Sequence, residues 1–306
     1  MTSVGATVEL EFAYGPARGP STEDCHVIGY RYPVGASTLV GDAWVLQIKD
    51  RKMVPLIGGL LNLNAVWRAP SGALFVTEVE GKVHYNAETD PARAAWRSFE
   101  FPFLIAGIFG LREDCVFVWG VRDAQPAVAR WDGKAWALMP PPQGFPLAMD
   151  GTAADALVLV GHDGLVTRWD GQRWTRVEVP TTTRISSVSV AGSQIWVGTA
   201  LGEVLCGGVS NLELKAQTDG CLTEIRFWQG HLYAASSLRG LLQLDGVEFR
   251  QVDEVSGARS LDGTESMLIS APHAVVMTED GVHYEGFDLS GFIHALEPIP
   301  FTRGSF

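Results

Sequence analysis

The sequence predicts an all-β protein, a single closed β-propeller of about seven blades with four strands each. Three observations support this fold class: a repeat of 37–38 residues, Asp-Gly turns between apolar segments rich in aromatic residues, and no sustained helical period. Propellers are built from four to eight such four-stranded units, which recur about every 40 residues. We therefore expect residues 1–306 to form one domain.

The repeat is clearest in two segments that share the same residue at six positions with one offset. Ala129–Pro142 and Thr167–Pro180 have Arg, Trp, Asp, Gly, Trp and Pro in common, each 38 residues apart. A degenerate copy, Leu244–Val252, places its Asp 75 residues after that of the second segment and has Phe249 in place of Trp. Asp-Gly between apolar runs is typical of a hairpin, because Gly accepts the positive φ that the turn needs. These turns are predicted to join the third and fourth strands of a blade.

A second signature marks the preceding hairpin of each unit. It is an apolar strand that ends in small residues and runs into a tight turn, and we interpret it as a second strand leading to a third. The seven copies are Trp44–Arg51, Leu74–Gly81, Val116–Asp123, Leu157–Gly164, Ile195–Gly202, Leu232–Gly240 and Val275–Gly281. First strands such as Ile185–Ala191 and fourth strands such as Trp174–Val179 complete the unit.

The two ends of the chain carry the strands that could close the ring. Thr7–Ala13 and Phe292–Pro298 both alternate apolar and polar residues, and we favour the N-terminal segment as the closing strand. Residues 15–41 contain several Gly and Pro and fit the repeat least well. We expect them to form an irregular loop region.

The segment IWVGTALGEV and the WDGxxW turns resemble the YVTN/two-component-regulator class of β-propeller repeats, and more loosely the WD40-type and Asp-box propellers. The resemblance covers roughly residues 40–290. The sequence lacks the GH…WD pairing of WD40 repeats and the Ser and spacing of the sialidase Asp-box. No activity of either family is carried over.

Composition narrows the function classes. The net charge is −12, from 23 basic and 35 acidic residues, which argues against a general nucleic-acid binder. No run of eighteen apolar residues and no secretory signal are present, so we expect a cytoplasmic monomer without a membrane span. The cysteines form no close-spaced pair, and the seven histidines share no register, so we expect reduced structural thiols, no metal and no cofactor. The cysteines are Cys25, Cys115, Cys206 and Cys221.

Four repeated tryptophans beside the Asp-Gly turns allow two interpretations. Trp131, Trp136, Trp169 and Trp174 could present aromatic platforms to a sugar, as in propeller lectins. Periodic aromatic residues more often fill the space between strands and blades, and we favour that packing role.

The turns from second to third strands supply the candidate binding residues, because loops on a rigid scaffold concentrate binding groups. These turns are charged and differ from one another, which favours a protein-recognition surface over a catalytic site. Solvent exposure alone also explains charged turns, and both interpretations stay open. The predicted protein-binding residues are Arg51, Glu80, Arg122, Asp123, His162, Asp163, Glu203, Arg239, Glu279 and Asp280.

We expect a non-enzymatic scaffold for another protein, and the acidity suggests a basic partner, for instance as an antagonist (immunity protein) or an assembly adaptor. We assign no catalytic residue. Two alternatives remain: a glycan-binding lectin, and a lyase-, lactonase- or glycosidase-like enzyme with its site at the tunnel mouth. The enzyme alternative predicts inward-facing residues among Arg112, Asp114, Glu224, Arg226 and Glu265.

Overall fold

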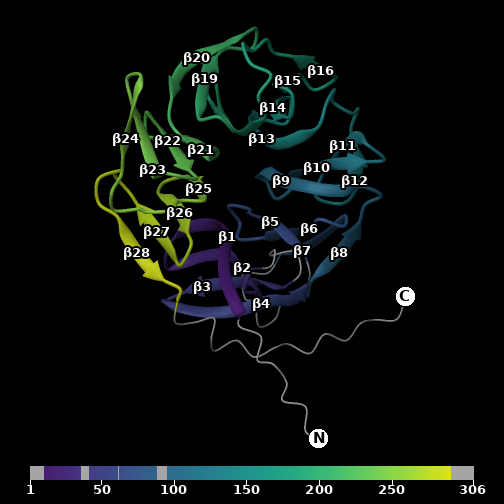
Figure 1. The fold of residues 1–306 in the computed structure, drawn as a ribbon. Helices are drawn as coiled ribbons and strands as arrows, with labels where there is room; N and C mark the ends of the chain where they lie inside the picture. Colours follow the sequence, from purple (N-terminus) through teal and green to yellow (C-terminus); the bar gives the residue numbers. More distant parts are fainter. Residues whose placement is uncertain (1–9, 36–40, 61, 88–94, 291–306) are drawn as a thin grey trace, which may run out of the picture.

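Seven four-stranded antiparallel sheets are arranged around a central axis, which confirms the predicted β-propeller (Figure 1). The computed structural model describes residues 10–35, 41–60, 62–87 and 95–290. Each blade is one contiguous stretch of chain, with its four strands in sequence order across the sheet. The described residues contain no helix that could cross a membrane.

The strands of the first four blades are β1 (Leu10–Ser21), β2 (Asp24–Pro33), β3 (Asp42–Lys49) and β4 (Lys52–Leu60); β5 (Leu63–Arg68), β6 (Leu74–Glu78), β7 (Lys82–Asn86) and β8 (Arg97–Glu100); β9 (Leu104–Arg112), β10 (Cys115–Arg122), β11 (Gln125–Trp131) and β12 (Trp136–Leu138); β13 (Pro146–Ala153), β14 (Ala156–Gly161), β15 (Val166–Trp169) and β16 (Trp174–Arg176). Those of the last three are β17 (Ile185–Ala191), β18 (Gln194–Thr199), β19 (Glu203–Gly207) and β20 (Leu212–Gln217); β21 (Leu222–Trp228), β22 (His231–Ser236), β23 (Gly240–Asp245) and β24 (Glu248–Gln251); β25 (Ser260–Gly263), β26 (Met267–Ala271), β27 (Ala274–Thr278) and β28 (Glu285–Asp288).

The predicted second strands are correct in the five middle blades, where they are β6, β10, β14, β18 and β22. In the first and last blades the prediction is wrong by one strand, because Trp44–Arg51 and Val275–Gly281 correspond to the third strands β3 and β27. The second strands there are β2 and β26, which the repeat signature missed. The count of seven blades holds because each blade still contains one copy.

The expectation of an irregular loop over residues 15–41 is wrong for the described part up to Pro33, which forms most of β1 and all of β2. Pro16 and Pro20 misled the sequence interpretation. They lie at the two irregularities of the β1–β2 register, between Tyr14 and Ala17 and beyond Arg18. β1 is also the edge strand of its sheet. Proline is tolerated at bulges and on edge strands, where its missing N–H breaks no ladder.

The Asp-Gly turns join third and fourth strands as predicted. In blades three and four, Oδ1 of Asp132 and of Asp170 accepts hydrogen bonds of 2.8–2.9 Å from the backbone N–H groups two and three residues further on. Asp280 makes the same two contacts in the last blade, so its turn is a third member of this class. Gly133 and Gly171 have φ of 91° and 93°, which explains why glycine follows the aspartate.

The hydrophobic core lies between neighbouring blades, and the repeated tryptophans belong to it. Trp131 and Trp169 are buried, and each packs on the tryptophan across its Asp-Gly turn. The ring centroids are 5.5 Å apart for Trp131–Trp136 and 5.2 Å apart for Trp169–Trp174. The exposed aromatic platform that a lectin requires is therefore not formed by Trp131 or Trp169, and these rings serve packing.

The ring closes by packing between the first and last blades. Ala17 N–H donates to Ser260 Oγ (3.2 Å), and Gly19 N–H donates to a carboxylate oxygen of Asp262 (3.1 Å). Beneath these bonds, one apolar cluster joins residues of the first blade, such as Leu46, to residues of the last. No strand is shared between blades among the described residues.

Of the two segments predicted to close the ring, only part of one is described. Residues 10–13 belong to β1 and pair with β2 in their own blade. Residues 7–9 and 292–298 lie outside the described residues. All four cysteines are free thiols, and burial raises the pKa of the Cys25 thiol to about 12.

Candidate functional site

The topology sorts the turns onto two faces of the propeller. Because neighbouring strands are antiparallel, the second-to-third turns and the connections between blades lie at one end of every sheet. We call this end the loop face. The first-to-second and third-to-fourth turns, including all the Asp-Gly turns described above, lie at the other end, which we call the opposite face.

Seven of the ten predicted binding residues lie together at the loop face. They are Glu80, Arg122, Asp123, His162, Asp163, Glu203 and Arg239. The placement of Arg51, Glu279 and Asp280 on this face was wrong, because they lie at third-to-fourth turns and therefore on the opposite face. The error follows directly from the one-strand displacement in the first and last blades.

The loop face also carries large apolar side chains that the sequence prediction did not include. The exposed fractions are 55% for Leu104, 39% for Phe145, 64% for Leu201 and 74% for Leu238. Leu201 and Leu238 are 37 residues apart and occupy equivalent turns of neighbouring blades. A single exposed leucine is ordinary, but several at one end among charged residues form a surface that can exclude water from a contact.

Hydrogen bonds to side-chain hydroxyl groups fix the two turns that contain Leu201 and Leu238. Thr199 Oγ1 accepts hydrogen bonds from the N–H groups of Leu201 (3.3 Å) and Glu203 (3.0 Å). In the next blade Ser236 Oγ accepts from the N–H groups of Leu238 (3.4 Å) and Arg239 (3.3 Å). A hydroxyl that closes a turn in this way fixes the backbone, so less conformational entropy is lost when the turn is bound.

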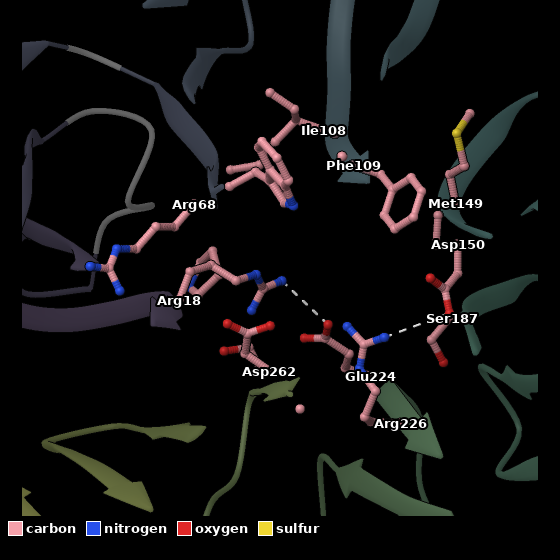
Figure 2. A pocket seen from close by; sticks show the side chains of 18 of the residues that line it. Arg18, Arg68, Ile108, Phe109, Met149, Asp150, Ser187, Glu224, Arg226 and Asp262 are labelled. Atoms are coloured by element: carbon pink, nitrogen blue, oxygen red, sulfur yellow. Dashed lines mark hydrogen bonds and ion pairs between the residues drawn. The ribbon is translucent and has the colours of Figure 1, made fainter. Parts of the chain in front are cut away.

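A cavity of about 1370 Å³ runs along the propeller axis and is lined by the first strands of all seven blades. Figure 2 shows an apolar side of this tunnel formed by Ile108, Phe109 and Met149. β9 contributes Gly107 to this wall, where a Cβ would overlap the indole of Trp119. Glycine there lets the indole pack against the strand and form part of the wall.

The other side of the tunnel carries two ion pairs. Arg18 Nη2 lies 3.3 Å from Glu224 Oε1, and Arg226 Nη1 lies 3.6 Å from Asp150 Oδ2 (Figure 2). Arg18 belongs to the first blade, Asp150 to the fourth, and both Glu224 and Arg226 to the sixth. Each pair therefore bridges blades that are not adjacent.

The tunnel carboxylates also tie neighbouring inner strands together. Asp150 Oδ2 accepts a hydrogen bond from Val190 N–H (2.8 Å), and Glu224 Oε2 accepts one from Leu261 N–H (3.0 Å). Burial raises the pKa of Asp150, although Arg226 and the Val190 N–H favour its charged form. Burial disfavours the charged form of Arg226, but the surrounding carboxylates raise its pKa overall. The carboxylates of Asp150 and Glu224 thus both connect inner strands of different blades.

The inward-facing residues expected for an enzyme are only partly found. Glu224, Arg226 and Glu265 line the tunnel, as that alternative predicted. Arg112 and Asp114 instead form an exposed ion pair of 2.9 Å at the β9–β10 turn. Within the described part of the chain, no three His, Cys, Asp or Glu side chains converge to hold a metal ion.

The sequence prediction missed six charged residues of the tunnel wall: Arg18, Asp24, Arg68, Asp150, Arg259 and Asp262. A signal for two of them exists. Asp-Gly-Thr occurs at Asp150 and again at Asp262, 112 residues later, which is three repeat periods. Arg18 was hidden because β1 had been interpreted as an irregular loop.

No family model matches this sequence, and no curated protein matches it. The solved structures that share its fold include two of YCF48. A structure of YCF48 bound to D1 peptide is 12% identical, with a TM-score of 0.56 over 74% of this chain and 82% of its own. YCF48 from Cyanidioschyzon merolae is 14% identical, with a TM-score of 0.55 over 74% of this chain and 84% of its own. The resemblance to YVTN-type repeats stays a prediction, and what the comparisons show is the fold: the chain is a seven-bladed β-propeller similar in architecture to YCF48.

Proposed function

We propose that this protein is a non-enzymatic scaffold that binds another protein through its loop face. The observation that carries the proposal is the set of exposed apolar side chains on turns that hydrogen bonds hold rigid, above all Leu201 and Leu238. Large apolar anchors surrounded by polar groups are the usual energetic centre of a protein interface. The structural similarity to YCF48, which has been solved with a bound peptide, is consistent with this use of the fold.

Charge supports a basic partner. The chain carries a net charge of −12, and a protein of opposite sign is attracted and steered towards it. The association rate with such a partner falls as ionic strength rises, because salt screens the attraction between the charges. The rate at which an apolar contact dissociates does not depend on this screening. Two roles suit this chemistry: an antagonist that covers a basic protein, and an adaptor that holds one during assembly.

The test uses two matched pairs of substitutions on the same two blades. L201E/L238E places charges on the loop face. V209E/V247E places them on the opposite face, where Val209 and Val247 are 52% and 63% exposed. The wild-type protein and both variants are used to capture partners from the native host, and captured proteins are quantified by mass spectrometry.

We expect one stoichiometric partner that binds wild type and V209E/V247E but is lost with L201E/L238E. Binding of that partner should weaken as salt is raised. Equal capture by both double variants, or the absence of any stoichiometric partner, contradicts the proposal.

A further inference from the structure

The tunnel offers more to a partner than the loop face alone. β9 begins at the loop face with Leu104 and lines the cavity from Ala106 to Leu111. Six extended residues cover about 20 Å, so a strand-like peptide of that length could follow β9 from the loop face into the tunnel. Within the described ranges of the chain β9 pairs with β10 only, so its other edge has no strand partner there. An unpaired strand edge presents N–H and C=O groups that suit an extended peptide.

The residues of the tunnel walls indicate which groups of such a peptide they would bind. Ile108 and Phe109 are half-buried and face the cavity, so they can still bury an apolar side chain. Across the tunnel, the Arg226 side chain is 24% exposed, and its buried Nε has no hydrogen-bond partner among the described residues. Its neighbours Asp150, Glu224 and Asp262 are acidic, which disfavours an incoming anion. A neutral acceptor such as a peptide carbonyl suits this guanidinium best.

The charged side chains that line the tunnel favour a basic residue in the bound peptide. Of the described residues, six carboxylates and four guanidiniums line the cavity. Three ion pairs occupy Arg18, Arg68 and Arg226. Glu265 and Glu279 make no side-chain ion pair with the described residues, and both lie at the mouth on the opposite face. A cation that reaches this mouth would find two carboxylates that are exposed and available.

From these observations we infer that the partner inserts an extended peptide segment into the tunnel. An apolar side chain of this segment contacts Ile108 and Phe109, and a Lys or Arg side chain reaches Glu265 and Glu279. The inference rests on the proposed function, because it names the part of the partner that the protein recognises. The peptide enters from the loop face, beside the exposed side chains that bind the rest of the partner.

The test obstructs the tunnel by placing a large side chain at an exposed position outside the hydrophobic core. Ala106 is exposed and lines the tunnel, whereas Ala137 is exposed on β12, the outermost strand of the same blade. A106W therefore obstructs the tunnel, and A137W is the matched control. The probe is a positional-scanning library of fluorescein-labelled hexapeptides, and binding is followed by fluorescence anisotropy.

We expect wild type and A137W to select hexapeptides with a central apolar residue and a Lys or Arg towards one end. A106W should bind the selected peptides at least about tenfold more weakly, the loss typical of blocking a central contact. E265Q/E279Q should retain the apolar preference and lose the basic one. The inference is overturned if wild type selects no hexapeptide, or if A106W binds the selected peptides as tightly as A137W does.

The two proposals fail separately. If A106W captures the host partner as well as wild type while L201E/L238E loses it, the loop face binds the partner and the tunnel does not. If L201E/L238E also captures it normally, the proposed function itself is wrong.

Discussion

Replacing Asp150 by alanine should destabilise the protein strongly, because Asp150 supports three blades at once. Its carboxylate faces Arg226 at 3.6 Å and accepts the Val190 N–H at 2.8 Å. The side chains of Asp150 and Arg226 are 9% and 24% exposed, so water screens the pair poorly. Removing one partner of a buried ion pair typically costs about 3–5 kcal/mol, since the other charge loses its buried partner. Glu224 and Asp262 still offset part of the Arg226 charge.

Two further variants divide this cost into its parts. D150N keeps an amide oxygen that can accept the Val190 N–H but removes the charge, so we expect a loss smaller than that of D150A. D150A/R226M removes both charges and should recover part of the stability, because an apolar replacement leaves no guanidinium that has lost its ion-pair partner. Urea unfolding followed by tryptophan fluorescence suits the measurement, since urea does not screen charges as guanidinium chloride does.

The result that refutes this reasoning is a small effect without coupling. If D150A lowers the free energy of unfolding by less than about 1 kcal/mol, the pair behaves like an exposed salt bridge. If R226M does not recover stability in the D150A background, the two residues do not act together.

Three other substitutions test separate parts of the structure. Burial, and next the Arg68 guanidinium, lower the pKa of His26 from 6.5 to about 3, so between these pH values the unfolded chain binds one more proton than the folded chain. The free energy of unfolding should therefore fall as the pH drops from about 6.5 towards 3. In urea titrations at several pH values, H26Q should make this dependence on pH less steep. S260A leaves the Ala17 N–H unpaired at the ring closure and should cost about 1–3 kcal/mol by urea unfolding; an unchanged unfolding curve would show that this contact does not hold the ring. G107A forces a methyl group against Trp119 and should cost about 1–3 kcal/mol with a changed near-ultraviolet circular dichroism spectrum, and a native spectrum would show that the tunnel wall adapts freely.

Much of the fold could be predicted from the sequence because the middle blades repeat their turn chemistry. An Asp-Gly pair predicts a hairpin from local sequence alone, because the aspartate accepts hydrogen bonds from backbone N–H groups within the same turn. The first blade lacks this signal. Its inner strand β1 contains Pro16 and Pro20, which are acceptable because they lie at register irregularities of a strand at the sheet edge. That position is a tertiary property, which the local sequence does not show.

The candidate site was predicted in part for the same reason. The turns of the middle blades were placed on the correct face, but Arg51, Glu279 and Asp280 were assigned to it because their strands were displaced by one. The ion pairs of the tunnel could not be predicted, since Arg18 and Glu224 are 206 residues apart and meet only when the ring closes. Their contact depends on the curvature of the whole propeller.

Hydrogen exchange on the isolated complex with the native partner tests the central claim most directly. The account predicts that amide exchange slows at the loop-face turns around residues 122–124, 162–164, 200–202 and 237–239. The Asp-Gly turns on the opposite face, at 132–134 and 170–172, should exchange as they do in the free protein. Protection of the Asp-Gly turns with unchanged exchange at the loop-face turns would contradict the account.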